Sequence, residues 1–148
     1  MHKRVAVEVK INRTLTKERT TKPMTDQRPP MWIGHTHMAV NDVAATKAFL
    51  LELGMRDVFP KSEDFAILEI RAGTHIIVEA AKEPVTAGQT AGFDLMVEDI
   101  ETMHAELTAK GLSPNVLEPG SIHTTFTISE PGGIVLKYFS SHNSGEPV

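Results

Sequence analysis

One order of secondary-structure signals occurs twice along this chain, and this internal repeat is the feature that most restricts its fold. In each copy, a strand pattern is followed by apolar residues at helical spacing and then by three short β-prone stretches separated by turn residues. The copies share their element order more than their residue identities. Since one curled four-stranded sheet alone leaves a face bare, the repeat predicts an α+β fold of two βαβββ modules around a shared cleft.

Capping and turn residues divide the first module into elements. Asn41 and Asp42 signal the start of a helix, and Gly54 signals its end. Ala72 and Gly73 predict a tight turn between two strands. The sequence therefore predicts a strand over 32–40, a helix over 43–53, and strands over 55–60, 65–71 and 74–80.

The second module repeats these signals after a linker over 82–90 that contains Pro84 and Gly88. Gly111 ends the second helix, and Pro131-Gly132-Gly133 forms the turn before the last strand. The predicted elements are a strand over 91–98, a helix over 99–110, and strands over 113–117, 123–129 and 134–140.

Charge separates an N-terminal segment from this body. Residues 1–23 hold seven basic and two acidic residues, a net charge of +5, whereas the remainder holds eight basic and seventeen acidic residues, a net charge of −9. Prolines at positions 29 and 30 interrupt regular structure. We predict a basic, disordered extension over 1–30, one domain over 31–141 with modules at 32–81 and 91–141, and a tail over 142–148. An interaction arm or a targeting segment is the alternative for the basic extension.

Composition narrows the function classes. The chain has no cysteine, which excludes disulfides and thiolate metal sites and suits a cytoplasmic location. A net charge of −4 and only 5% aromatic residues argue against nucleic-acid binding. No apolar run approaches the ~18 residues of a membrane span. We therefore predict a cytoplasmic protein with neither a nucleic-acid nor a membrane partner.

Several short motifs, in order, resemble those of the vicinal oxygen chelate superfamily, the glyoxalase, bleomycin-resistance and extradiol-dioxygenase type. The stretch from His35 to Asp42 resembles the family's His-x-x-x-x-Val-x-Asp opening strand. Residues 49–55 resemble its Phe/Tyr-x-x-x-Leu-Gly-Met helix ending, and residues 97–111 resemble its second-module helix. Phe126 and Glu130-Pro131-Gly132-Gly133 resemble the turn into its last strand. The match covers about residues 32–141.

This resemblance implies a small-molecule site and, in many members, a divalent metal held from four strand positions. Carried over, the first two positions are His35 and Glu79, both good ligands. The other two are Gly92, which has no side chain, and Lys137, whose ammonium repels a cation. The implied metal site is therefore partial. We therefore favour a protein without a cofactor, and the alternative is one divalent metal ion, Zn, Fe, Mn or Ni.

Strand alternation predicts which side chains share the cleft. Residues of one parity gather ionisable groups on otherwise apolar strands, and a loop-edge histidine lies close to them. The predicted cleft set is His35, His37, His75, Glu79, Asp94, His123 and Lys137.

Three readings of this set stay open. In one, Lys137 replaces the metal electrostatically, pairs with Glu79 or Asp94, and presents a cation to a ligand. In another, His35 and Glu79 hold a metal with help from His37, His75 or Asp94. In the third, the histidines are structural and the cleft is closed by side chains.

The preferred function is the binding of a small organic molecule in the inter-module cleft, without the full metal site. The alternative is a metal-dependent lyase, isomerase or dioxygenase that uses His35 and Glu79. The sequence leaves open whether the chain is an enzyme. The resemblance also implies a homodimer.

Overall fold

The computed structural model describes residues 28–141, and it contains the two predicted βαβββ modules. The segments predicted as an extension before residue 28 and as a tail after residue 141 lie outside the described residues. Module one holds β1 (His35–Val40), α1 (Val43–Glu52), β2 (Arg56–Asp57), β3 (Phe65–Glu69), the short turn η1 (Arg71–Gly73) and β4 (His75–Ala80). Module two holds β5 (Thr90–Val97), α2 (Ile100–Ala109), β6 (Glu118–Pro119), β7 (Thr124–Ser129) and β8 (Val135–Ser140).

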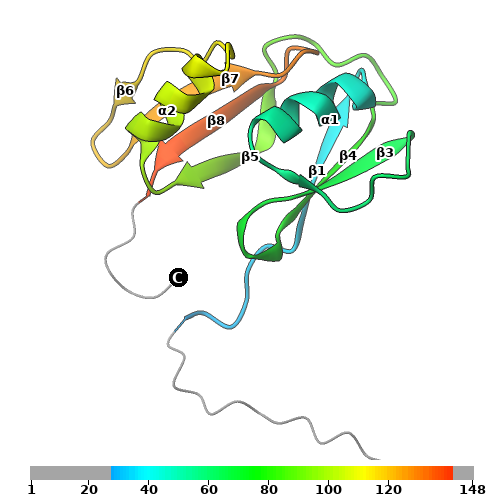
Figure 1. Ribbon diagram of the computed structural model, residues 1–148, viewed down its shortest axis with the longest axis horizontal. Coiled ribbons are helices and arrows are strands. Elements are labelled where there is room, and N and C mark those ends of the chain that lie inside the picture. Colours follow the sequence, from blue (N-terminus) through cyan, green and yellow to red (C-terminus); the bar gives the residue numbers. More distant parts are fainter. Residues whose placement is uncertain (1–27, 142–148) are drawn as a thin grey trace, which may run out of the picture.

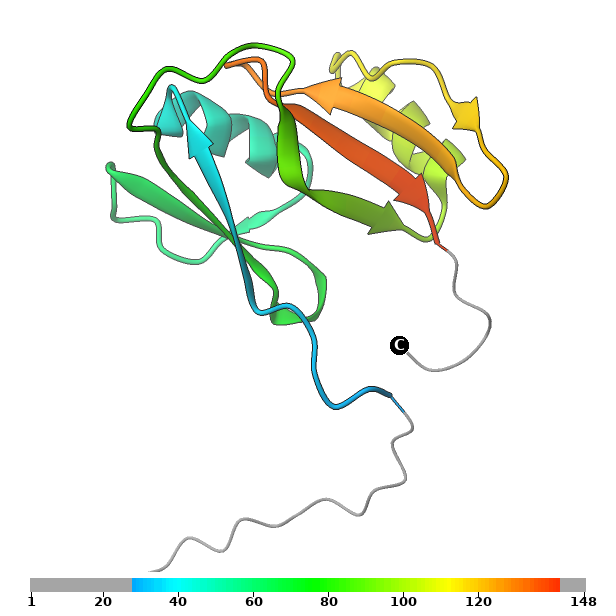
Figure 2. The same cartoon turned by 180° about the vertical axis from the view of Figure 1, so that it is seen from behind.

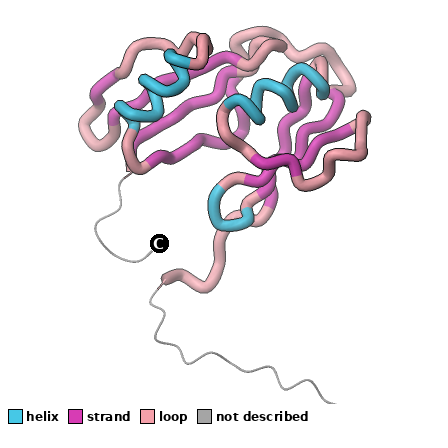
Figure 3. The backbone as a smooth tube through the Cα atoms, viewed as in Figure 1, coloured by secondary structure: helices cyan, strands magenta, loops and turns pink. Residues whose placement is uncertain are grey.

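The two modules have the same sheet topology. The strand order is β1-β4-β3-β2 in module one and β5-β8-β7-β6 in module two. In each sheet the first and last strands of the module pair in parallel, and the other pairs are antiparallel. Figure 1 shows the sheets side by side with α1 and α2 on the same side, and Figure 3 shows these helices lying against the strands. The predicted α+β fold of two modules is confirmed.

Both helices begin at an aspartate that caps the first turn. The Asp42 carboxylate accepts a hydrogen bond from the Ala45 N–H at 2.9 Å, and the Asp99 carboxylate accepts one from the Thr102 N–H at 2.9 Å. Gly54 and Gly111 follow the helices with φ of 95° and 79°. A left-handed residue at this position ends a helix, and glycine adopts it without a Cβ penalty. Neither described helix has the length and apolar character needed to cross a bilayer.

Strand alternation sends apolar side chains to the helix-covered face. In β1, Met38 and Val40 are buried, whereas His35, His37 and Ala39 are exposed. The other strands contribute to the same core Ala66, Leu68, Ile76, Val78, Leu95, Phe126, Ile128, Leu136 and Tyr138. Figure 2 shows the opposite face, which no described helix covers.

Two predicted strands differ from those observed. The predicted strand over 55–60 is reduced to Arg56–Asp57, and the strand predicted over 113–117 is wrong, because the short strand β6 begins only at Glu118. The Asn115 side chain accepts a hydrogen bond from the Thr127 backbone N–H, in the place where a backbone carbonyl of a ladder would stand. Pro114 has no N–H to donate. The Asn115 backbone N–H still donates to the Thr127 carbonyl at 2.9 Å, so the backbone of Asn115 makes one half of a ladder pair and its side chain makes the other.

The modules meet along the free edges of β1 and β5. These two strands contact each other, but the described residues form no hydrogen-bonded ladder between them. A buried polar contact joins the modules: the Thr46 hydroxyl on α1 donates to the Glu130 carboxylate in the β7–β8 turn at 2.8 Å. The same carboxylate accepts the Ile134 N–H at 2.9 Å. Lys110, which caps the end of α2, donates its ammonium to the Glu52 carbonyl at 2.8 Å.

Candidate functional site

The predicted cleft residues lie on or beside the strand face that no described helix covers. His35, His37 and Glu79 are exposed there, and His75 is half-buried between β1 and β3. The His37 Nδ1 atom lies 3.4 Å from a Glu79 oxygen. In module one the structure therefore forms two separate pairs across β1 and β4, His35 with His75 and His37 with Glu79.

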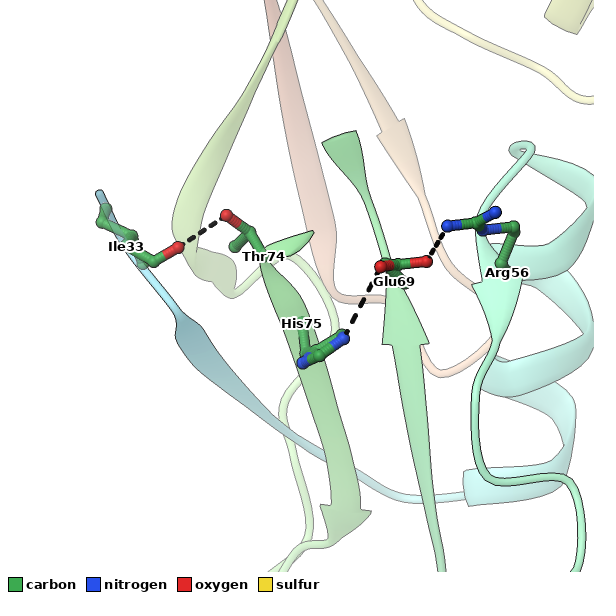
Figure 4. Close-up of polar contacts among 5 residues, drawn as sticks. All are labelled: Ile33, Arg56, Glu69, Thr74 and His75. Atoms are coloured by element: carbon green, nitrogen blue, oxygen red, sulfur yellow. Dashed lines mark hydrogen bonds and ion pairs between the residues drawn. The ribbon is translucent and has the colours of Figure 1, made fainter. Parts of the chain in front are cut away.

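A row of polar side chains crosses module one at one level of the sheet. The register pairs His35 with His75, His75 with Glu69, and Glu69 with Arg56. The two histidine rings stack with their centroids 5.6 Å apart, His75 Nε2 lies 3.9 Å from a Glu69 oxygen, and Arg56 forms an ion pair with the other Glu69 oxygen. Figure 4 shows Glu69 between His75 and Arg56, and the neighbouring Thr74 hydroxyl donating to the Ile33 carbonyl.

Sequence reasoning missed Glu69 and Arg56 as members of this row. A signal for Glu69 was present, because Phe65, Ile67 and Glu69 alternate on β3 with the buried Ala66 and Leu68. Arg56 gave no such signal, since its strand has only two residues.

The structure does not place the predicted metal ligands together. In the β1–β4 register, Glu79 pairs with Ala39, four positions beyond His35. Four residues of a parallel strand span about 13 Å, so one ion cannot contact both side chains in this arrangement. Among residues 28–141, no three His, Asp or Glu side chains converge into a group that could hold an ion. These donors do not fit the metal centre that the resemblance implies.

In module two the predicted residues are more scattered. Asp94 and Lys137 are register partners on β5 and β8, both exposed, and no ion pair or hydrogen bond of Lys137 is found within the described chain. The expected pairing of Lys137 with Glu79 or Asp94 is therefore not found. Gly92 lies where the β5–β8 register shifts between Thr90 and Asp94, a bulge that glycine accommodates.

His123 is held at the edge of module two. Its Nδ1 atom lies 2.9 Å from the Ser140 carbonyl oxygen, and its ring meets Phe139 edge-on at 5.1 Å. These contacts fix the ring beside the end of β8, the strand that carries Lys137.

A cavity of about 480 Å³ lies between the modules, at the free edge of β5. Its walls come from the end of α1, the turn after β3, the strand β5, the outer part of α2, and Tyr138 of β8. Of the predicted cleft set, Asp94 alone is part of this wall. The apolar part of the wall consists of Leu53, Met55, Ile70, Leu95, Met96, Val97, Met103 and Tyr138.

The charged groups around the cavity are mostly acidic. They are Arg71, Asp94, Glu98, Asp99 and Glu106. The Arg71 guanidinium forms an ion pair with Glu98 at 2.6 Å, which links the β3–β4 turn of module one to the end of β5. Hydrogen bonds from the Thr102 backbone N–H and hydroxyl lower the pKa of Asp99. Asp99 is therefore occupied as a helix cap and stays ionised.

The two-module fold of this chain is similar to that of several solved structures. A lactoylglutathione lyase from Agrobacterium tumefaciens has a similar structure, with a TM-score of 0.63, 15% identity, and coverage of 80% of this chain and 99% of that chain. So does TnmS3, an antibiotic-binding protein from Streptomyces sp. CB03234, with a TM-score of 0.61, 17% identity, and coverage of 74% and 95%. The oxidase ChaP-H2 gives a TM-score of 0.60, 19% identity, and coverage of 80% and 98%.

These likenesses concern the fold, since each identity is below one residue in five. In sequence comparisons, no family model matches the chain and no curated protein matches it.

Proposed function

We propose that this protein binds a small, largely apolar organic molecule in the cavity between its two modules. The observation that carries this proposal is the cavity itself, at about 480 Å³. Binding sites for small molecules enclose about 300–1,000 Å³ and are lined mainly by apolar side chains. A cleft closed by its own side chains, the third reading of the sequence, would have had a volume below this range.

The proposed binding does not depend on a metal ion. The donor groups support this: His35 and Glu79 are four register positions apart, and Lys137 lies at the position where the resemblance implies a carboxylate ligand. The antibiotic-binding neighbour supports binding as a function of this fold, and the lyase and oxidase neighbours support catalysis as the alternative.

Titration with a neutral fluorescent probe tests the proposal. The naphthyl ketone propionyl-dimethylaminonaphthalene is apolar, uncharged and sensitive to the polarity around it. We expect saturable binding with one site per chain and a blue-shifted emission, because the apolar wall excludes water from the probe. Unsaturable, weak emission changes would contradict the proposal.

Two substitutions on α2 provide a matched pair. Met103 lines the cavity, whereas Ala105, two residues away, is exposed and does not. Met103→Trp should weaken probe binding about tenfold or more, because the indole occupies cavity space. Ala105→Trp should leave the affinity unchanged. If the two variants bound the probe with equal affinity, the probe would bind outside the cavity.

The metal-dependent alternative has its own measurement. Elemental analysis of the dialysed protein should find no stoichiometric Zn, Fe, Mn or Ni. A retained ion that is lost in His35→Ala would overturn the metal-free proposal. If the site is an altered ancestral one, Lys137→Glu should increase divalent-metal affinity in isothermal titration, since it removes a positive charge and adds a ligand.

The proposal includes a homodimer in the cytoplasm. The family resemblance supports the dimer, and the cysteine-free composition suits a reducing compartment. Light scattering after size-exclusion chromatography tests the dimer: a monomeric mass at micromolar concentration would contradict it. Fractionation of the source cells tests the location.

A further inference from the structure

Tyr138 is a polar side chain built into the apolar wall of the inter-module cavity. It lies on β8, between Leu95 of β5 and Phe126 of β7 in the register. Its ring stacks on Phe126 with centroids 4.7 Å apart and an angle of 6° between the planes. The side chain is only 3% exposed, yet it lines the cavity. The stacking on Phe126 therefore fixes the ring, and the hydroxyl is the only polar group of this side chain.

The hydroxyl of Tyr138 has no hydrogen-bond partner among residues 28–141. In the same part of the chain, no completely buried side-chain oxygen lacks a partner, so the Tyr138 oxygen keeps some exposure to solvent, and Tyr138 lines the cavity. Buried tyrosine hydroxyls normally find a partner. Burial alone raises the pKa of Tyr138 to about 12, so the group stays an O–H donor at neutral pH.

We propose that the Tyr138 hydroxyl is the specificity-determining hydrogen-bond donor of the cavity and selects apolar ligands that carry a carbonyl or ether oxygen. This inference rests on the proposed function, because it names the ligand class of the same cavity. An apolar ligand without an acceptor would seal the hydroxyl away from water and leave it unpaired. The ligand that fits places its acceptor oxygen at Tyr138 and its hydrocarbon part against Leu95 and Met103.

The charged residues around the cavity also restrict the net charge of the ligand. Asp94, Glu98 and Glu106 are acidic, and the single basic group of this wall, Arg71, is already paired with Glu98. An anionic acceptor such as a carboxylate is repelled by this rim. The acceptor is therefore a neutral oxygen, on a neutral or cationic molecule.

A pair of probes and a pair of proteins test this inference. The first probe is the naphthyl ketone used above, and the second is its propyl analogue, in which a methylene replaces the carbonyl. Tyr138→Phe removes the hydroxyl and keeps the ring that stacks on Phe126. The natural protein should bind the ketone about five- to tenfold more tightly than the propyl analogue, the value of one net hydrogen bond. In Tyr138→Phe this preference should disappear.

The emission wavelength of the bound ketone distinguishes a hydrogen bond from Tyr138 from a purely structural role of this residue. A hydrogen bond to the ketone oxygen shifts its emission to the red, so the ketone bound to Tyr138→Phe should emit further to the blue than the ketone bound to the natural protein. Unchanged discrimination and unchanged emission in Tyr138→Phe would overturn the role of Tyr138 while leaving the proposed function intact. If neither probe binds the natural protein, both the proposed function and this inference are overturned.

Discussion

The two modules have one architecture and two different kinds of surface. In module one, the ionisable groups of the uncovered face are paired across neighbouring strands, from His35 through His75 and Glu69 to Arg56. In module two, the corresponding face carries Asp94 and Lys137 as register partners that form no ion pair with each other. On its helix-covered side, module two contributes Tyr138 to the wall of the cavity between the modules.

This difference shows that a repeated fold does not repeat its chemistry. Apolar alternation, an aspartate cap and a left-handed glycine are enough to build either module. The ionisable side chains are not needed for that, and they differ between the two modules. The ligand site we propose belongs to neither copy alone, because its wall needs Leu53 and Ile70 from one and Leu95 and Tyr138 from the other.

The largest expected effects come from matched truncations in the two helices. Leu50 of α1 and Leu107 of α2 are both completely buried. Leu50→Ala and Leu107→Ala should each lower the free energy of unfolding by about 2–5 kcal/mol. Because the modules share a buried contact, both variants should shift one common transition in urea, followed by circular dichroism. Two separate transitions, each moved by one variant, would show that the modules are energetically independent.

The buried contact between the modules predicts the next largest effect. Thr46→Val removes the hydroxyl that donates to Glu130, whose side chain is only 3% exposed, and leaves a carboxylate oxygen without its donor. We expect a loss of about 1–3 kcal/mol in the free energy of unfolding. Thr46→Ser keeps the hydroxyl and is the control. Equal stabilities of the two variants in urea titrations would mean that the contact does not hold the modules together.

The smallest effect is a change in acid sensitivity that is confined to module one. Lys47 lies 2.6 Å from Asp57, and this hydrogen-bonded ion pair lowers the pKa of Asp57. A lowered pKa in the folded state stabilises the protein above the ordinary carboxyl pKa, and this contribution is lost as the pH falls through the lowered value. Lys47→Met should therefore flatten the acid side of the profile of stability against pH.

Lys110 provides the control for this profile. Its ammonium bonds to the Glu52 carbonyl, which does not titrate. Lys110→Met should keep the shape of the profile, and the acid sensitivity that remains in Lys47→Met should come in part from Asp99 of module two, whose pKa is also lowered. A profile unchanged by Lys47→Met would show that the ion pair does not contribute to stability.

Much of the fold could be predicted from local signals, and less of the site could be. The helices and most strands follow from alternation and from caps such as Asp42 and Asp99, because these depend on residues a few positions apart. The strand predicted over 113–117 was wrong because Asn115 pairs with Thr127, twelve residues away, through one backbone and one side-chain hydrogen bond instead of a regular ladder. His35 and Glu79 shared a predicted face, yet only the register shows that they lie four positions apart.

By itself, the sequence determined the two-module α+β fold, the face that carries the histidines, and the absence of thiolate chemistry, since each depends on residue type and short-range periodicity. Only the tertiary structure decided the partners of those histidines and the position of the cavity. The physical reason is that strand register and the distance between the edges of β1 and β5 are set by packing across the whole core, where no local pattern reports them. For the same reason, only the tertiary structure shows that Tyr138, a core residue by its alternation, lines the cavity between the modules.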